Sequence, residues 1–178
     1  FTKFDATVLV KYRADLKTQN PQQVPSYNDI LIREIAATLK EFPQLNACWH
    51  HDGIWTYSEI NIGIAVDTPA GLVAPVLRNV DTLALDEISQ QSKKLIEQAR
   101  GGSLTQPQLI GGTFTMTSLG MFDIDHFTPI LNLPQSAILG VGRIVREPVA
   151  EGDQIVIRDR MSVSLTVDHR VVDGAPAA

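Results

Sequence analysis

The sequence is poor in cysteine, in long hydrophobic runs and in positive charge. Cys48 is the only cysteine among 178 residues, which excludes an intramolecular disulfide and a CxxC metal or redox motif. No apolar run has the length of a transmembrane helix, so we expect no membrane association. The net charge is -5 and basic residues do not cluster, so we expect no binding to nucleic acid.

What the sequence does have is the composition of a globular protein. Hydrophobic residues make up 44% of the chain and charged residues 20%, a balance that argues against disorder. A chain of this length can form one sizeable core but not two full domains. We therefore predict a single domain over residues 1–178.

Apolar periodicity divides the chain into helices and strands. The first helical pattern stops at Asn20, while Ser26 fits the N-cap and Pro43 the stop signal of the second. Asp52 and Gly53, between aromatic flanks, predict a hairpin turn. The predicted helices are 5–19, 26–42 and 83–100, and the predicted strands are 59–67, 71–78, 111–120, 136–145 and 154–168. Together they predict an α+β domain with helices packed against a mostly antiparallel or mixed sheet.

The segment SLTVDHRVVDG, residues 164–174, places a histidine and two carboxylates after an apolar strand. Asp173 follows His169 by four residues, and Gly174 permits a turn that would return Asp173 toward the strand. An imidazole titrates at about pH 6.5, so His169 fits the role of a general base. A lone HxxxD pattern is short and common, however, and a histidine that pins a turn explains it more simply.

The chain shows no nucleophile of its own for such a base. The GxSxG pattern is absent, and Cys48 is best interpreted as a small buried hydrophobe. A base without a nucleophile fits an enzyme whose substrate supplies the nucleophile, such as a thiol. His50 and His51 are adjacent, so they point to opposite faces of a strand, and no other His or Cys lies at ligand spacing. We therefore expect no metal site.

Hydroxyl side chains in another predicted strand offer a second catalytic element. The stretch FTMTSLG carries Thr115 and Thr117 on one face and Ser118 on the other, just before a glycine turn. A donor positioned on a tetrahedral oxyanion stabilises the transition state by about 3–4 kcal/mol. Taken alone, these residues are ordinary strand residues.

Several stretches together resemble one family. DHRVVDG is similar to the signature of the dihydrolipoamide acyltransferases, the core components of 2-oxo-acid dehydrogenase complexes. Four further stretches match that family in order, so the resemblance covers nearly the whole chain. They are LKEFPQLNA, INIGIAVDTPAGLVAPVLRN, GGTFTMTSLGMF and PILNLPQSAILGVG.

This resemblance implies a fold, a reaction and an assembly. The fold would be like that of chloramphenicol acetyltransferase, a mixed β-sheet flanked by helices that forms trimers, and the trimers would build a larger core. Coenzyme A and the dihydrolipoyl group of a separate lipoyl domain would meet in a channel between subunits. A decarboxylase and a dihydrolipoamide dehydrogenase would be partners, in the bacterial cytoplasm or, less favoured, the mitochondrial matrix. Residues 1–178 would be the catalytic domain of a longer, multidomain chain.

The resemblance also implies roles for named residues. His169 would be the catalytic base that removes the thiol proton of coenzyme A. Thr117 of the neighbouring subunit would donate a hydrogen bond to the oxyanion, with Ser118 as the substrate-binding hydroxyl if the register shifts by one. Asp173 would hold the loop that orients His169, and Asp168 would contribute to the same loop.

The acyl group stays open at this point. Acetyl is the commonest choice in the family, and succinyl and branched-chain groups are alternatives because selectivity depends on pocket shape. An antibiotic acetyltransferase of the same fold and a catalytically inactive core scaffold are further interpretations. Asp123 stands where the family often has glycine, so we expect the loop around it to differ slightly. The residues that contact coenzyme A also stay open, the basic candidates being Arg78, Lys93, Lys94 and Arg100.

Overall fold

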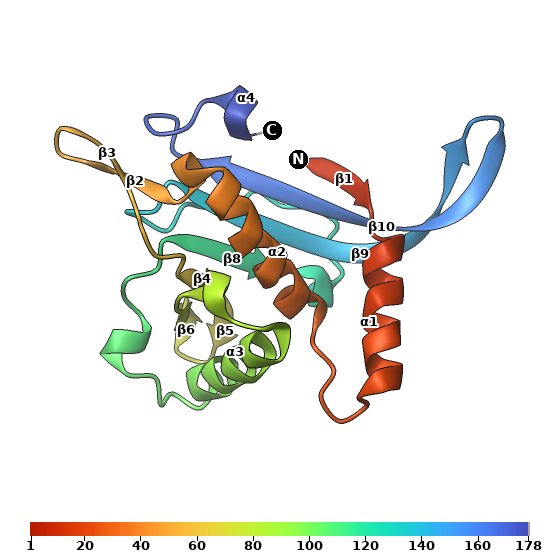
Figure 1. Ribbon diagram of the computed structural model, residues 1–178, viewed down its shortest axis with the longest axis horizontal. Coiled ribbons are helices and arrows are strands. Elements are labelled where there is room, and N and C mark those ends of the chain that lie inside the picture. The colour runs from red at the N-terminus through yellow and green to blue at the C-terminus, as the bar shows by residue number, and fades with distance from the viewer. Residues whose placement is uncertain (178) are drawn as a thin grey trace.

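The computed structural model describes residues 1–177 and is built on one six-stranded β-sheet (Figure 1). Its strands are β1 Thr2–Asp5, β4 Ile62–Ile64, β7 Val76–Leu77, β8 Phe114–Ser118, β9 Ala137–Glu151 and β10 Gln154–Val167. They lie in the order β1-β10-β9-β8-β4-β7. β8 runs parallel to β4 and β9, and the other neighbours are antiparallel. The sheet is therefore mixed, and the predicted α+β class is confirmed.

Three helices correspond to the predicted ones: α1 Thr7–Gln19, α2 Tyr27–Glu41 and α3 Leu85–Arg100. Ser26 caps α2 as expected, because its hydroxyl accepts the N–H of Asp29 at 3.1 Å while the Asp29 carboxylate accepts the N–H of Ser26 at 2.7 Å. Asp29 also accepts a hydrogen bond from the buried Ser92 hydroxyl of α3 at 2.5 Å. The same carboxylate thus starts α2 and ties it to α3. Within residues 1–177, none of the helices has the length and apolar character needed to cross a membrane.

Each of the predicted strands 59–67 and 71–78 is divided between two sheets. β4 and β7 belong to the main sheet, whereas β5 Val66–Thr68 and β6 Gly71–Val73 form a separate hairpin. Gly71 has a φ of 113°, which glycine adopts without a steric cost, so the chain can reverse there. The predicted strands were too long because the apolar alternation continues through this change of sheet.

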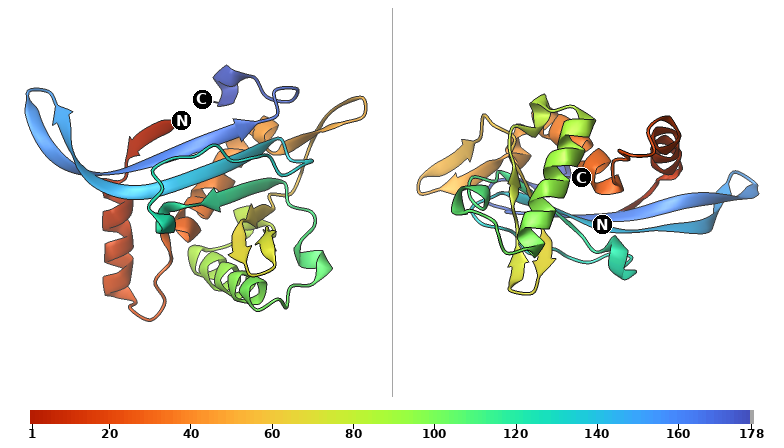
Figure 2. Two further views of the ribbon diagram at one scale, coloured as in Figure 1. Left: turned by 180° about the vertical axis from the view of Figure 1, so that it is seen from behind. Right: turned by 90° about the horizontal axis from the view of Figure 1, so that it is seen from below.

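A second hairpin, β2 Ala47–His50 and β3 Gly53–Thr56, turns at His51 and Asp52, one residue before the predicted Asp52–Gly53 position. Cys48 on β2 is 6% exposed and belongs to the core, which confirms its interpretation as a buried hydrophobe. Figure 2 shows this hairpin at the same end of the sheet as the loop that follows β10, opposite the tip of the β9–β10 hairpin. The short helix α4, Gly174–Ala177, follows that loop.

Candidate active site

His169 lies on the loop between β10 and α4. The strand ends at Val167, so His169 does not reach the apolar face that a longer strand would have given it, and its side chain is 75% exposed. Its Nδ1 atom lies 3.6 Å from Oδ1 of Asp173, whose side chain is also exposed. The carboxylate of Asp173 therefore lies beside the imidazole, at a distance longer than a direct hydrogen bond.

The His169 loop, residues 168–173, is anchored on both sides of the histidine. The N–H of Asp168 donates to the Ser136 carbonyl at 2.8 Å, and Val172 is 2% exposed. The N–H groups of Val171 and Val172 both donate to the Asp168 carbonyl, at 2.9 and 3.0 Å. Gly174 starts α4 without a left-handed backbone, so this turn does not use the conformational freedom of glycine, and the Asp168 carbonyl organises it.

The side chain of Asp168 holds the same loop through Arg170. Its Oδ1 accepts the Arg170 N–H and Nε at 3.0 Å each, and its Oδ2 accepts Nη2 at 2.6 Å. The Asp168 side chain is only 10% exposed, and the Arg170 guanidinium holds the pKa of this carboxyl below its usual value, although burial opposes the effect. Asp168 therefore stays ionised at neutral pH and supports the loop.

Thr117 occupies a different setting, in the strand β8 between β4 and β9. It lines two cavities, which we name after one residue of each. The Pro129 cavity, of 510 Å³, lies among β8, β6 and the segment 127–132, and the Arg100 cavity, of 280 Å³, lies between β8 and α3. Thr115 shares the Pro129 cavity, as the predicted strand parity requires, but is 2% exposed and donates to Gln135 Oε1 at 2.6 Å. Thr115 is thus committed to a structural bond.

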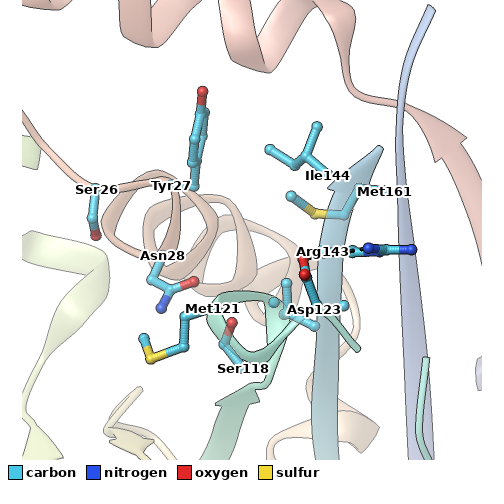
Figure 3. A pocket seen from close by; sticks show the side chains of 12 residues that line it. Ser26, Tyr27, Asn28, Ser118, Met121, Asp123, Arg143, Ile144 and Met161 are labelled. Atoms are coloured by element: carbon cyan, nitrogen blue, oxygen red, sulfur yellow. Dashed lines mark ion pairs between the residues drawn. The ribbon is translucent and has the colours of Figure 1, made fainter. Parts of the chain in front are cut away.

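Ser118 lines the Arg100 cavity and, with Arg143, a third cavity of 370 Å³ at the start of α2 (Figure 3). The positive charge of Arg143 is already paired, because its guanidinium lies 2.7 Å from the Asp125 carboxylate and 3.3 Å from that of Asp123. Asp123 has a φ of 62°, in the left-handed region that favours glycine. This conformation explains why glycine suits the position and how the short polar side chain of Asp can replace it.

The structure does not bring Thr117 and His169 together within one chain. Thr117 pairs with Gly140, Gly140 pairs with Ser164, and His169 lies five residues further along. β10 ends at Val167, three residues past Ser164, and lies two strands away from β8. At about 3.3 Å per residue and about 4.8 Å per strand, the two side chains are on the order of 15 Å apart. His169 also lines none of the three cavities described above. A single chain therefore holds the two groups without forming one site from them.

The basic candidates for coenzyme A differ in their surroundings. Arg78 is exposed, but it donates to the carbonyls of Pro107 and Ile110, both at 2.9 Å, and so holds a loop. Arg100 lines the cavity that Thr117 and Ser118 share. Among residues 1–177, no three His, Cys, Asp or Glu side chains are grouped so that they could hold a metal ion.

Solved structures place this architecture in a class of acyltransferase folds. The chain superposes on the dihydrolipoamide acetyltransferase of Azotobacter vinelandii, in which the catalytic roles of a serine, a histidine and an asparagine were investigated. The TM-score is 0.95 at 34% identity, over 99% of this chain and 74% of that one. The cubic core of a pyruvate dehydrogenase multienzyme complex gives 0.94 at 35%, with the same coverage. A chloramphenicol acetyltransferase gives 0.57 at 16%, over 99% and 80%, so it shares the fold alone.

The sequence comparisons identify the family within that class. Residues 1–178 match the family model of the 2-oxoacid dehydrogenases acyltransferase catalytic domain, and the chain belongs to this family. It is 43% identical over 153 residues to the acetyltransferase component of the pyruvate dehydrogenase complex of Rickettsia bellii, covering 86% of this chain and 37% of that one. The mitochondrial counterpart in Schizosaccharomyces pombe is 43% identical over 156 residues, covering 86% and 32%.

A relative with another acyl group is equally similar. The succinyltransferase component of the 2-oxoglutarate dehydrogenase complex of Haemophilus influenzae is 46% identical over 143 residues, covering 80% of this chain and 35% of that one. The chain therefore spans about a third of the length of these three curated relatives. The family resemblance seen in the sequence motifs is confirmed, while overall identity does not separate acetyl from succinyl.

Proposed function

We propose that this chain transfers an acyl group between a dihydrolipoyl thiol and coenzyme A, at a site built from two copies of the chain. One observation carries the proposal. Thr117 precedes His169 by 52 residues and Asp173 follows it by four, the same two separations as among the serine, histidine and asparagine studied in the Azotobacter enzyme. Threonine in place of serine keeps the hydroxyl donor, and aspartate in place of asparagine keeps the oxygen that faces the imidazole.

The chemistry follows from these groups. Nε2 of His169 takes the proton of the coenzyme A thiol as the sulfur attacks the thioester carbonyl of the acylated dihydrolipoyl group. The carbonyl oxygen becomes an oxyanion, to which the Thr117 hydroxyl donates a hydrogen bond. The intermediate collapses, the carbon–sulfur bond to the dihydrolipoyl group breaks, and the imidazolium returns its proton to the departing sulfur. Asp173, whose carboxylate lies 3.6 Å from the imidazole, helps to orient His169.

The need for two copies rests on the separation of the two groups. A hydrogen bond or a direct proton transfer needs heavy atoms about 3 Å apart, and one chain holds Thr117 and His169 much further apart. If a neighbouring copy supplies the second group, the exposure of His169 is explained, because the partner covers it. A closed trimer provides three equivalent sites of this kind and uses one type of contact.

Acetyl is the acyl group that we assign. The Pro129 cavity beside Thr117 is lined by aliphatic and aromatic side chains, with only Thr115, Thr117 and Asn132 as polar members. It contains no cation to pair with a succinyl carboxylate, and burying an unpaired charge is expensive. A small apolar acyl group fits such a lining, and branched-chain and succinyl groups are the alternatives that the experiment below separates.

The partners follow from the same proposal. A lipoyl domain would deliver the dihydrolipoyl group, and trimers would assemble into the core that a decarboxylase and a dihydrolipoamide dehydrogenase surround. Relatives from bacteria and from a mitochondrion fit either compartment, with the bacterial cytoplasm favoured.

The test is acyl transfer to free dihydrolipoamide from acetyl-, succinyl- and isobutyryl-coenzyme A, supplied in parallel. We expect the highest kcat/KM with the acetyl donor and its loss in His169→Ala. Preference for the succinyl donor would overturn the acyl assignment alone. A trimer that is inactive with all three donors would overturn the catalytic proposal and favour a structural scaffold.

A further inference from the structure

The β2–β3 hairpin, which the proposed mechanism does not use, lies against the His169 loop. Both segments sit at the same end of the sheet in Figure 1 and in the left view of Figure 2. Trp49 of β2 is 39% exposed, and the Arg170 guanidinium lies over its ring, 5.7 Å from the centroid. This distance falls within the range of a cation–π contact.

Arg170 is therefore held from two sides. Asp168 accepts its Nε and Nη2, and the Trp49 indole supports its planar group. An arginine side chain has many rotamers. A flat aromatic surface restricts the side chain to those rotamers that keep both hydrogen bonds to a carboxylate. Without Trp49, the Arg170 side chain, 59% exposed, would leave Asp168 more often.

Two backbone hydrogen bonds also connect the His169 loop to the β2–β3 hairpin. The N–H of Ser136 donates to the Ala47 carbonyl at 2.9 Å, and the Ser136 carbonyl accepts the N–H of Asp168 at 2.8 Å. Ser136, which joins the two segments, is fully buried. The hairpin is thus linked to the His169 loop indirectly through the backbone of Ser136, and directly through the contact of Trp49 with Arg170.

We propose that Trp49 is a positioning residue for His169, which acts by stacking on Arg170 and so fixing the Arg170–Asp168 pair on either side of the histidine. The inference rests on the proposed function, because the position of the imidazole affects turnover only if it meets the substrate. Small displacements of a general base reduce turnover more than they reduce binding.

The experiment compares Trp49→Ala with Trp55→Ala in the full, assembled protein. Trp55 lies on β3 of the same hairpin and is also exposed, but it stacks on His50 at 4.3 Å between ring centroids. We expect Trp49→Ala to lower kcat about tenfold and leave the KM for coenzyme A within about twofold. Trp49→Phe retains an aromatic surface and should restore kcat, and Trp55→Ala should match the wild type.

A second readout does not depend on activity. Hydrogen exchange at the amides of Val171 and Val172, which bond to the Asp168 carbonyl, should accelerate in Trp49→Ala and not in Trp55→Ala. In an Arg170→Lys background, Trp49→Ala should add no further effect, because the planar guanidinium that stacks on Trp49 is then absent. Equal exchange and equal kcat in the two tryptophan variants would overturn the inference. Absence of wild-type turnover would instead refute the proposed function. The exchange data would still show whether Trp49 stabilises the His169 loop.

Discussion

The two groups of the proposed site are held in place by different means. Thr117 belongs to a strand with a neighbour on each side, so the register of the sheet fixes its hydroxyl. His169 projects from an exposed loop, and its place depends on a few hydrogen bonds and on the Asp168–Arg170 pair. Changes in the sheet should therefore reduce protein stability first, whereas changes around the loop should reduce catalysis first.

The largest effect on catalysis should come from a substitution in the His169 loop. His169→Ala removes the general base, and we expect kcat to fall about 10²–10⁴-fold. Because the side chain is 75% exposed, the free energy of unfolding should change by less than about 0.5 kcal/mol. Acyl-transfer kinetics and urea unfolding of the same preparation check both parts. A large loss of stability in this variant would show that His169 also supports the fold.

On the sheet side, Thr117→Val removes the hydroxyl and keeps the shape of the side chain. We expect kcat to fall about 10²–10³-fold, as for the loss of an oxyanion donor. Thr117→Ser keeps the hydroxyl and serves as the matched control, which should stay near the wild type. If the valine variant kept full kcat while Ser118→Ala lost it, Ser118 would be the donor.

Thr115→Val should reduce stability more than Thr117→Val does, although both residues lie on the same strand. Thr115 is buried and donates to Gln135, which is itself 4% exposed, so the substitution leaves a buried amide oxygen unpaired. The free energy of unfolding should fall by about 1–3 kcal/mol, measured by urea denaturation. Thr117→Val, at a half-buried position, should lose less than about 1 kcal/mol in the same assay.

The Asp168–Arg170 pair predicts a pH dependence of stability. Because Arg170 lowers the pKa of the folded Asp168 carboxyl below its ordinary value of 3.8, the ionised form stabilises the native state at higher pH. This contribution is fully present above that ordinary value and is lost as the pH falls through the folded value. With an exposed partner, we expect a difference of at most about 1 kcal/mol between wild type and Asp168→Asn at pH 7. The difference should disappear in denaturation curves at the acid end; a difference that persists there would have another cause.

The smallest effect should come from the loop beyond Thr117. Asp123→Gly relieves a left-handed backbone but removes an exposed ion pair with Arg143, so we expect a gain in unfolding free energy of less than about 1 kcal/mol. Asp123→Ala has neither the freedom of glycine nor the polar side chain, and should be less stable than both. Thermal unfolding of the three proteins gives the order directly.

Much of the fold could be predicted because long helices and strands carry a clear period. The helices 83–100 and 26–42 and the strand 154–168 had such periods, and Ser26 had a recognisable cap pattern. The strand β1 contains four residues and one large apolar side chain, Phe4, which is too little for a period-two pattern. The division of 59–67 and 71–78 was missed because strand patterns do not record which sheet a residue joins.

The candidate site could be predicted in part for a similar reason. His169, Thr117 and Asp173 lie in contiguous sequence motifs, so the resemblance to a family identified them. The contact of Trp49 with Arg170 joins segments more than a hundred residues apart and has no sequence pattern of its own. The distance between Thr117 and His169 depends on strand order, which the sequence did not define.

The central claim is that one copy supplies His169 and a neighbour supplies Thr117, and mixing two inactive variants tests it directly. We would co-express His169→Ala with Thr117→Val and assay acyl transfer by the mixed trimers. In a random mixture, a site between neighbours receives both intact groups about one time in four, so activity should return to about a quarter of the wild-type level. Activity no higher than that of the separate variants would show that both groups act within one chain, and would contradict the account.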